Sequence, residues 1–201
     1  MRFFVLFIFI FSLTSSWAFE YQVGDVIVQS FDCYECRLIQ SETNSPYVHS
    51  GIVLKDEKGE YKIAEALGPI GLTPLKKFLS RGRLNTVFRA KEWNTLTLDE
   101  KKLLEKKMLE TFSTEFSGLS FDNEFLWDNY DNQGNETYYC AEFVAKFLNN
   151  FLNDRISPEP MSYKKNYEQW LRIFKGKVPD GLPGLSPSFF SRSSLFVEIK
   201  E

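Results

Sequence analysis

The chain has 201 residues, a formal charge of −3, 43% hydrophobic residues and 25% charged residues. This length and composition fit one globular domain with a hydrophobic core. A mildly acidic chain without a basic run matches neither nucleic acid nor an anionic membrane surface, so we expect neither as a partner.

The first 18 residues have the features of an export signal. Arg2 supplies a positive start, an apolar run extends from Phe3 to Leu13, and small residues precede a cleavage point after Ala18. That run is shorter than the roughly 20 residues that a membrane-spanning helix needs, although an uncleaved anchor is the alternative. We therefore expect a signal peptide over residues 1–18, a mature domain over residues 19–201 without a membrane segment, and a periplasmic or secreted protein.

Short strands and turns dominate the first half of the mature chain. The charged segment Lys55–Glu60 contains a glycine and is typical of a hairpin turn. A short helix is predicted over Thr73–Leu79, with Thr73 as N-cap and Pro74 at the first helical position. The predicted strands of this half are Val26–Val28, Val48–Leu54, Tyr61–Ala66 and Leu84–Arg89.

Helices dominate the second half. Thr97 and Glu100 predict a capping box that opens a helix from Leu98 to Phe112, and Ser113–Thr137 reads as a loop. Apolar residues at helical spacing predict a second helix that begins near Cys140. A further helix over Tyr163–Phe174 and a last strand over Leu195–Ile199 complete the order. A hairpin combined with separate helices indicates an α+β fold, with an antiparallel sheet or small barrel packed against helices.

His49 is the sole histidine of the chain and lies in a predicted strand. If the hairpin turn is centred near Glu57, Glu65 lies opposite His49 and the two side chains share a face, with Cβ atoms about 5 Å apart. A carboxylate there would fix the imidazole tautomer and leave the second ring nitrogen for chemistry. A register shift of one residue would instead place Ala66 opposite His49. The alternative interpretation is a strand histidine without a chemical role.

Cys140 opens a predicted helix, where the positive end of the helix dipole favours a thiolate and backbone N–H groups can hold an oxyanion. It also lies on the apolar stripe of that helix, so an ordinary buried core cysteine is the competing interpretation. The other two cysteines, Cys33 and Cys36, have the spacing of a redox motif without the strand–motif–helix context of one, which favours a local disulfide or two incidental thiols.

Four motifs, in a set order, resemble the circularly permuted NlpC-type cysteine hydrolases, most closely the YiiX/YebB-like branch. They cover most of the mature chain, from about Tyr21 to Ile199. The motifs are Gly24-Asp25-Val26-Ile27, Ser45-x-Tyr47-x-His49-x-Gly51, Glu65-Ala66-x-Gly68-Pro69 and Tyr139-Cys140-Ala141-Glu142-Phe143-Val144.

The resemblance implies a permuted papain-like fold in which Cys140 is the nucleophile, His49 the base and Glu65 the orienting acid. It also implies that Tyr47 lines the site or assists the oxyanion. No cofactor and no metal are expected. The implied substrates are a small peptide, a peptidoglycan fragment or a lipid-like amide, since relatives are thought to cleave amide bonds in cell-wall peptides or amide and ester bonds in lipid-like molecules.

One position departs from the family pattern, because Phe121 stands where relatives often carry tyrosine. If that hydroxyl serves catalysis or binding, rate or specificity differs in this chain. We therefore predict a cysteine amidase or peptidase with a Cys140–His49–Glu65 triad. The alternatives are a lipid-directed amidase, esterase or acyltransferase with the same triad, or a non-catalytic binding module on this fold.

Overall fold

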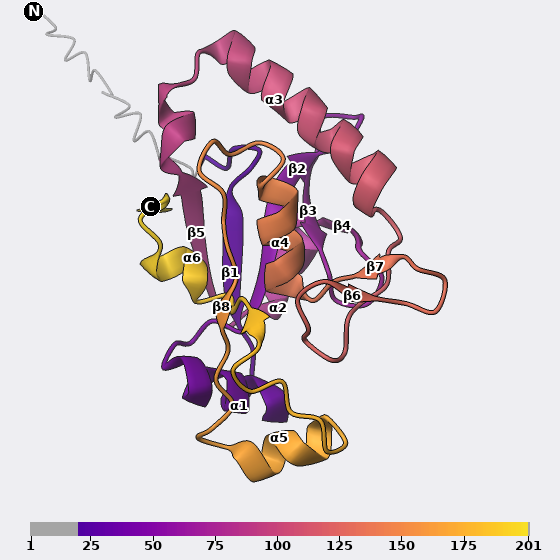
Figure 1. Cartoon of the computed structure of the whole chain (residues 1–201). Helices are drawn as coiled ribbons and strands as arrows, with labels where there is room; N and C mark the ends of the chain where they lie inside the picture. The colour runs from indigo at the N-terminus through magenta and orange to yellow at the C-terminus, as the bar shows by residue number, and fades with distance from the viewer. Residues whose placement is uncertain (1–19, 201) are drawn as a thin grey trace, which may run out of the picture.

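The computed structural model describes residues 20–200, and its centre is a six-stranded antiparallel sheet (Figure 1). The predicted signal peptide lies outside the described residues. The two edge strands do not pair with each other, so the predicted α+β fold is confirmed with an open sheet and not a closed barrel. In spatial order the strands are β10 (Phe196–Ile199), β5 (Leu84–Ala90), β1 (Val26–Ser30), β2 (His49–Lys55), β3 (Tyr61–Glu65) and β4 (Gly71–Pro74).

Helices cover both faces of this sheet. The central strand β1 is buried throughout, and its first three residues form an apolar run instead of an alternating pattern. Val26 and Val28 belong to the core that contains α4 (Cys140–Leu148) and one side of α3 (Leu98–Thr111), whereas Ile27 packs with Phe78 of α2 (Leu75–Arg81) on the other face. β2 and α4 both begin at the lower end of the sheet in Figure 1, which brings their first residues to the same end of the molecule.

A smaller apolar cluster lies at that same end, where α1 (Tyr34–Thr43) and α5 (Tyr167–Ile173) lie below the sheet in Figure 1. Its buried members are Leu38, Tyr163 and Trp170. Glu42 of α1 ties the two helices together, because its carboxylate accepts hydrogen bonds from the Trp170 indole at 3.2 Å and from two backbone N–H groups before α5 at 2.8 and 3.1 Å. The remaining short elements are β6 (Asn129–Tyr130), β7 (Glu136–Thr137), β8 (Glu159–Pro160), β9 (Pro183–Gly184) and α6 (Phe189–Arg192).

The hairpin register differs from the predicted one by two residues. Glu65 pairs with Gly51 and not with His49. The turn is centred one residue later than expected because the Asp56 carboxylate accepts hydrogen bonds from the backbone N–H groups of Lys58 and Glu60, which closes a longer turn. A shift of two keeps every side chain on its expected face, so His49 and Glu65 become diagonal neighbours on one face.

Of the other local predictions, some are confirmed and some are wrong. The capping box of Thr97 and Glu100 is confirmed at the start of α3. The N-cap prediction for α2 is wrong, because Thr73 belongs to β4, where it pairs with Ile63 of β3. The helix begins at Leu75 without a side-chain cap. The segment read as a loop begins within a π-helical turn, Phe112–Phe116, and contains β6 and β7. Within residues 20–200, no helix combines the length and apolar character needed to cross a membrane.

Candidate active site

The single histidine makes the contact that the sequence predicts. His49 Nε2 donates to Glu65 Oε2 over 2.7 Å, and both residues are buried, at 3% and 4% exposure. Because Nε2 is used by the carboxylate, Nδ1 is the ring nitrogen left for another partner. The Cys140 thiol lies near enough to the imidazole to interact with it, because it contributes to the raised pKa of His49. The structure therefore brings together Cys140, His49 and Glu65, although they belong to three different elements.

Aromatic rings and a guanidinium surround this pair. The Phe31 ring stacks on the imidazole at 5.4 Å between centroids, and Phe78 lies 5.8 Å from it on α2. Arg81, at the end of α2, places Nη2 at 2.7 Å from both oxygens of Glu65. None of these three residues is predicted from the sequence to belong to the site. A buried carboxylate needs partners, but nothing in the chain order shows that α2 supplies one of them.

Cys140 is the first residue of α4 and is buried, with 7% exposure. The residue before it, Tyr139, makes no side-chain cap, so the first backbone N–H groups of the helix have no side chain bonded to them at the cap position. The Tyr139 hydroxyl instead accepts a hydrogen bond from the Leu185 backbone at 2.7 Å, which fixes the segment after β9 against the start of α4. The thiol therefore lies where the helix dipole favours negative charge.

Opposing effects set the charge of the histidine. Burial favours the neutral ring, but hydrogen bonds and negative charge from Cys140 and Glu65 outweigh it and raise the pKa of His49 to about 9. Burial likewise opposes ionisation of Glu65, yet hydrogen bonds from His49, Thr73 and Arg81 and the charge of His49 hold its pKa below the usual range. At neutral pH the imidazole is thus protonated beside an ionised carboxylate, the state that stabilises a thiolate at Cys140.

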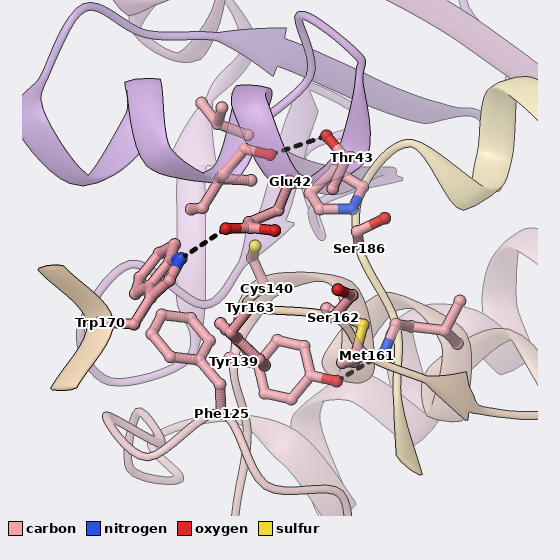
Figure 2. A pocket seen from close by; sticks show the side chains of 14 residues that line it. Glu42, Thr43, Phe125, Tyr139, Cys140, Met161, Ser162, Tyr163, Trp170 and Ser186 are labelled. Carbon is pink, nitrogen blue, oxygen red and sulfur yellow. Dashed lines mark hydrogen bonds between the residues drawn. The ribbon is translucent and has the colours of Figure 1, made fainter. Parts of the chain in front are cut away.

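A small pocket opens beside the thiol (Figure 2). Its walls come from α1, from α5 and from the loops around Phe125 and Leu185. The apolar lining residues are Ile39, Val48, Phe125, Tyr139, Met161, Tyr163, Trp170, Leu185 and Pro187.

The polar side chains of the pocket are mostly engaged within the protein. Glu42 accepts a bond from the Trp170 indole and Thr43 donates to the Ile39 carbonyl (Figure 2). The hydroxyls of Ser186 and Ser188 bond to each other. A ligand in this space would therefore meet mainly carbon atoms next to the Cys140 sulfur.

Two further sequence predictions concern Tyr47 and Phe121. The Tyr47 hydroxyl donates to Thr86 Oγ1 at 3.0 Å, and Tyr47 is not among the residues that line the pocket. Its role in substrate or oxyanion binding stays a prediction, and would require that bond to break. Phe121 packs edge-on against the pocket residue Phe125, with 6.2 Å between ring centroids. The position that carries tyrosine in relatives is therefore next to a lining residue and is not itself part of the pocket lining.

Within residues 20–200, one group of acids is spaced closely enough to hold a metal: Asp128, Glu136 and Glu142. The Lys146 ammonium bonds to all three carboxylates, including Glu142 Oε1 at 2.8 Å. These residues therefore do not fit a metal while Lys146 stays in place, because the ammonium already supplies the positive charge at their centre.

The fold is that of a permuted papain-like protein, and His49 and Glu65 precede Cys140 in the chain. The family of permuted papain-like amidase enzymes, YaeF/YiiX, C92, matches residues 20–192, and the chain belongs to it.

Among individual proteins, the chain is 28% identical over 144 residues to an uncharacterised protein, YiiX, of Escherichia coli K12. That match covers 72% of this chain and 65% of YiiX, slightly less than two thirds of the relative. The crystal structure of the metalloprotein YiiX from Escherichia coli O157:H7 has the same fold, with a TM-score of 0.74 at 22% identity, covering 90% of this chain and 97% of that one.

Proposed function

We propose that this protein hydrolyses an amide bond through a Cys140–His49–Glu65 triad, and that the pocket beside the thiol holds an apolar acyl group of the substrate. The observation that carries the proposal is the buried His49 ring, which is hydrogen-bonded to the Glu65 carboxylate and interacts electrostatically with the buried Cys140 thiol. A histidine with only a structural role has no need of a free cysteine as its second partner, and Cys140 is the free cysteine of the described chain.

In the proposed reaction, the proton of Cys140 already resides on His49, and the thiolate of this ion pair attacks the amide carbonyl carbon. The C–N bond breaks, the imidazolium gives its proton to the leaving amine, and a thioester remains on Cys140. Water then attacks the thioester while His49 accepts its proton, and the carboxylic acid leaves as the thiol is restored. Glu65 stabilises the imidazolium throughout and stays ionised.

The oxygen of the tetrahedral intermediate needs donors at the place where its charge develops. The uncapped backbone N–H groups at the start of α4 supply them, because they lie next to the thiol and at the positive end of the helix dipole. This support comes from the position of Cys140 at the first helical residue, which a cysteine elsewhere on the apolar stripe would lack.

The lining of the pocket favours a lipid-like amide over a cell-wall peptide. A muropeptide carries charged and hydroxyl groups that would lose water without gaining partners against Phe125, Trp170 and Met161. An acyl chain would instead gain about 0.8 kcal/mol for each methylene that it buries. The same chemistry applied to an ester, or to transfer of the acyl group to an acceptor other than water, is the second candidate.

Reactivity of the thiol tests the nucleophile directly. Cys33 and Cys36 form a disulfide, so iodoacetamide added to the unreduced protein reports on Cys140 among the three cysteines. We expect fast alkylation at neutral pH in the wild type and slow alkylation in His49→Ala. Reactivity equal to that of a free thiol at each pH, and unchanged in the variant, would refute the assignment.

Substrate class is tested by release of acid from matched panels of long-chain N-acyl amides, the corresponding esters and muropeptides. Turnover of the acyl amides alone supports the proposal, turnover of muropeptides alone contradicts the apolar preference, and ester turnover or acyl transfer supports the second candidate. We further propose that the protein works outside the cytoplasm, on the strength of the leader-like first 18 residues. N-terminal sequencing of the mature protein, with Phe19 as the expected first residue, tests this.

A further inference from the structure

Arg81 contacts the same carboxylate that holds the histidine. Its Nη2 lies 2.7 Å from both oxygens of Glu65, while His49 Nε2 lies 2.7 Å from one of them. The carboxylate is therefore bound by two cationic donors. His49 takes part in the proposed chemistry, whereas Arg81 makes no direct contact with the Cys140 thiol. Two donors on one carboxylate leave it little freedom to rotate.

We propose that Arg81 is a positioning residue of the site, which keeps Glu65 ionised and in the one rotation that orients the His49 ring. The inference rests on the proposed roles of His49 and Cys140. It adds a fourth side chain, from α2, to three that come from β2, β3 and α4.

One aromatic ring supports both cationic groups. Phe78 is fully buried, and its ring lies 5.2 Å below the Arg81 guanidinium and 5.8 Å from the His49 ring. Because Phe78 and Arg81 are three residues apart on α2, they lie on the same side of the helix. The buried phenylalanine thus sets the distance between α2 and the sheet at which the guanidinium reaches Glu65.

The position of Arg81 also carries a cost that a surface ion pair would avoid. The side chain is 28% exposed, and its Nε is buried without a hydrogen-bond partner within the described chain. An unsatisfied buried donor costs about 1–3 kcal/mol. The neighbouring arginine of the chain, Arg83, instead pairs with Asp32 at 71% exposure and bears no such cost. A contact kept at a cost next to a reacting group points to a role beyond stability.

The charged and titratable groups around Glu65 are His49 from β2, Arg81 from α2 and, through the imidazole, Cys140 from α4; the Thr73 hydroxyl of β4 also bonds to the carboxylate. Removal of Arg81 takes away one positive charge and one donor, so protonation of Glu65 becomes easier. A protonated Glu65 no longer stabilises the imidazolium. The low-pH loss of activity should therefore begin at a higher pH without Arg81.

The test compares Arg81→Gln with Arg83→Gln, which removes the same charge two residues away without touching Glu65. His49 is the sole histidine, so one labelled imidazole signal in NMR follows both its own titration and that of the carboxylate bonded to it. We expect the low-pH inflection of this signal to move up by about one pH unit in Arg81→Gln and to stay in place in Arg83→Gln. The acid limb of kcat/KM should move with it, and kcat/KM at neutral pH should fall by about 10-fold.

Arg81→Lys separates charge from geometry and serves if Arg81→Gln does not fold. It should keep the inflection near its wild-type pH and still lower kcat/KM, because a flexible ammonium lacks the fixed plane in which the guanidinium presents Nη2 to both oxygens. An unmoved inflection in Arg81→Gln, or equal shifts in both Gln variants, would overturn the proposal. The NMR readout needs no substrate, so failure of the amidase reaction itself would appear separately, as normal titrations in a protein without turnover.

Discussion

Replacing Glu65 by glutamine removes the negative charge that lies beside the buried His49 ring and keeps the size of the side chain at position 65. In the wild type, the pKa of His49 rises from 6.5 to about 9, and part of that rise comes from the hydrogen bond and charge of Glu65. A raised folded-state pKa stabilises the fold fully below pH 6.5, and this stabilisation is lost as the pH rises through 9. The full shift corresponds to about 3 kcal/mol.

Because Cys140 contributes the larger share of that shift and Glu65 the smaller, we expect Glu65→Gln to lower the free energy of unfolding more at pH 6 than at pH 10, by about 1 kcal/mol. Urea titrations of both proteins at the two pH values measure it. Losses that do not depend on pH, such as the cost of leaving Arg81 unpaired, cancel in the comparison. Equal penalties at pH 6 and pH 10 would show that the carboxylate does not charge the histidine, and would refute the electrostatic reasoning.

Three further predictions concern parts of the molecule outside the His49–Glu65 pair. Phe147→Ala, in the fully buried apolar side of α4, should lower the free energy of unfolding by about 3–5 kcal/mol in urea, and a loss equal to that of an exposed Leu103→Ala would contradict the packing. Cys33→Ser should cost about 2 kcal/mol in stability and leave alkylation of Cys140 intact, whereas abolished reactivity would indicate a redox role for the disulfide. Lys146→Met should destabilise the fold more at pH 8 than at pH 5. Burial raises the pKa of Glu142 to about 7 even with Lys146 present, so without the ammonium the ionised carboxylate costs more stability as the pH rises. A penalty independent of pH would contradict this.

The site was predictable from the sequence where a single residue type limits the choice. A chain with one histidine can place imidazole chemistry only at His49, and the helix signal after Tyr139 placed Cys140 at a helix N-terminus. The Glu65 contact was predicted with the wrong register and still formed, because the error of two residues preserves the face of a strand. An error of one residue would have lost it.

The rest of the site depends on packing between distant elements. Arg81 reaches Glu65 because α2 crosses the sheet at the distance that Phe78 sets, and no spacing in the chain encodes that distance. The α1 wall of the pocket depends likewise on the Glu42 bonds to α5, more than 120 residues away in the chain. Local patterns such as the capping box before α3 were confirmed because their partners lie within one helical turn.

The central claim, that Cys140 forms a covalent acyl intermediate oriented by His49, is tested most directly by mass spectrometry of the intact protein mixed with a long-chain acyl anilide and quenched in acid. We predict a mass increase equal to one acyl group, located at Cys140, in the wild type. His49→Ala should show none, and Cys140→Ala should lose turnover by about 10⁴-fold or more. Undiminished turnover by Cys140→Ala, or an acyl group found on another residue, would contradict the account.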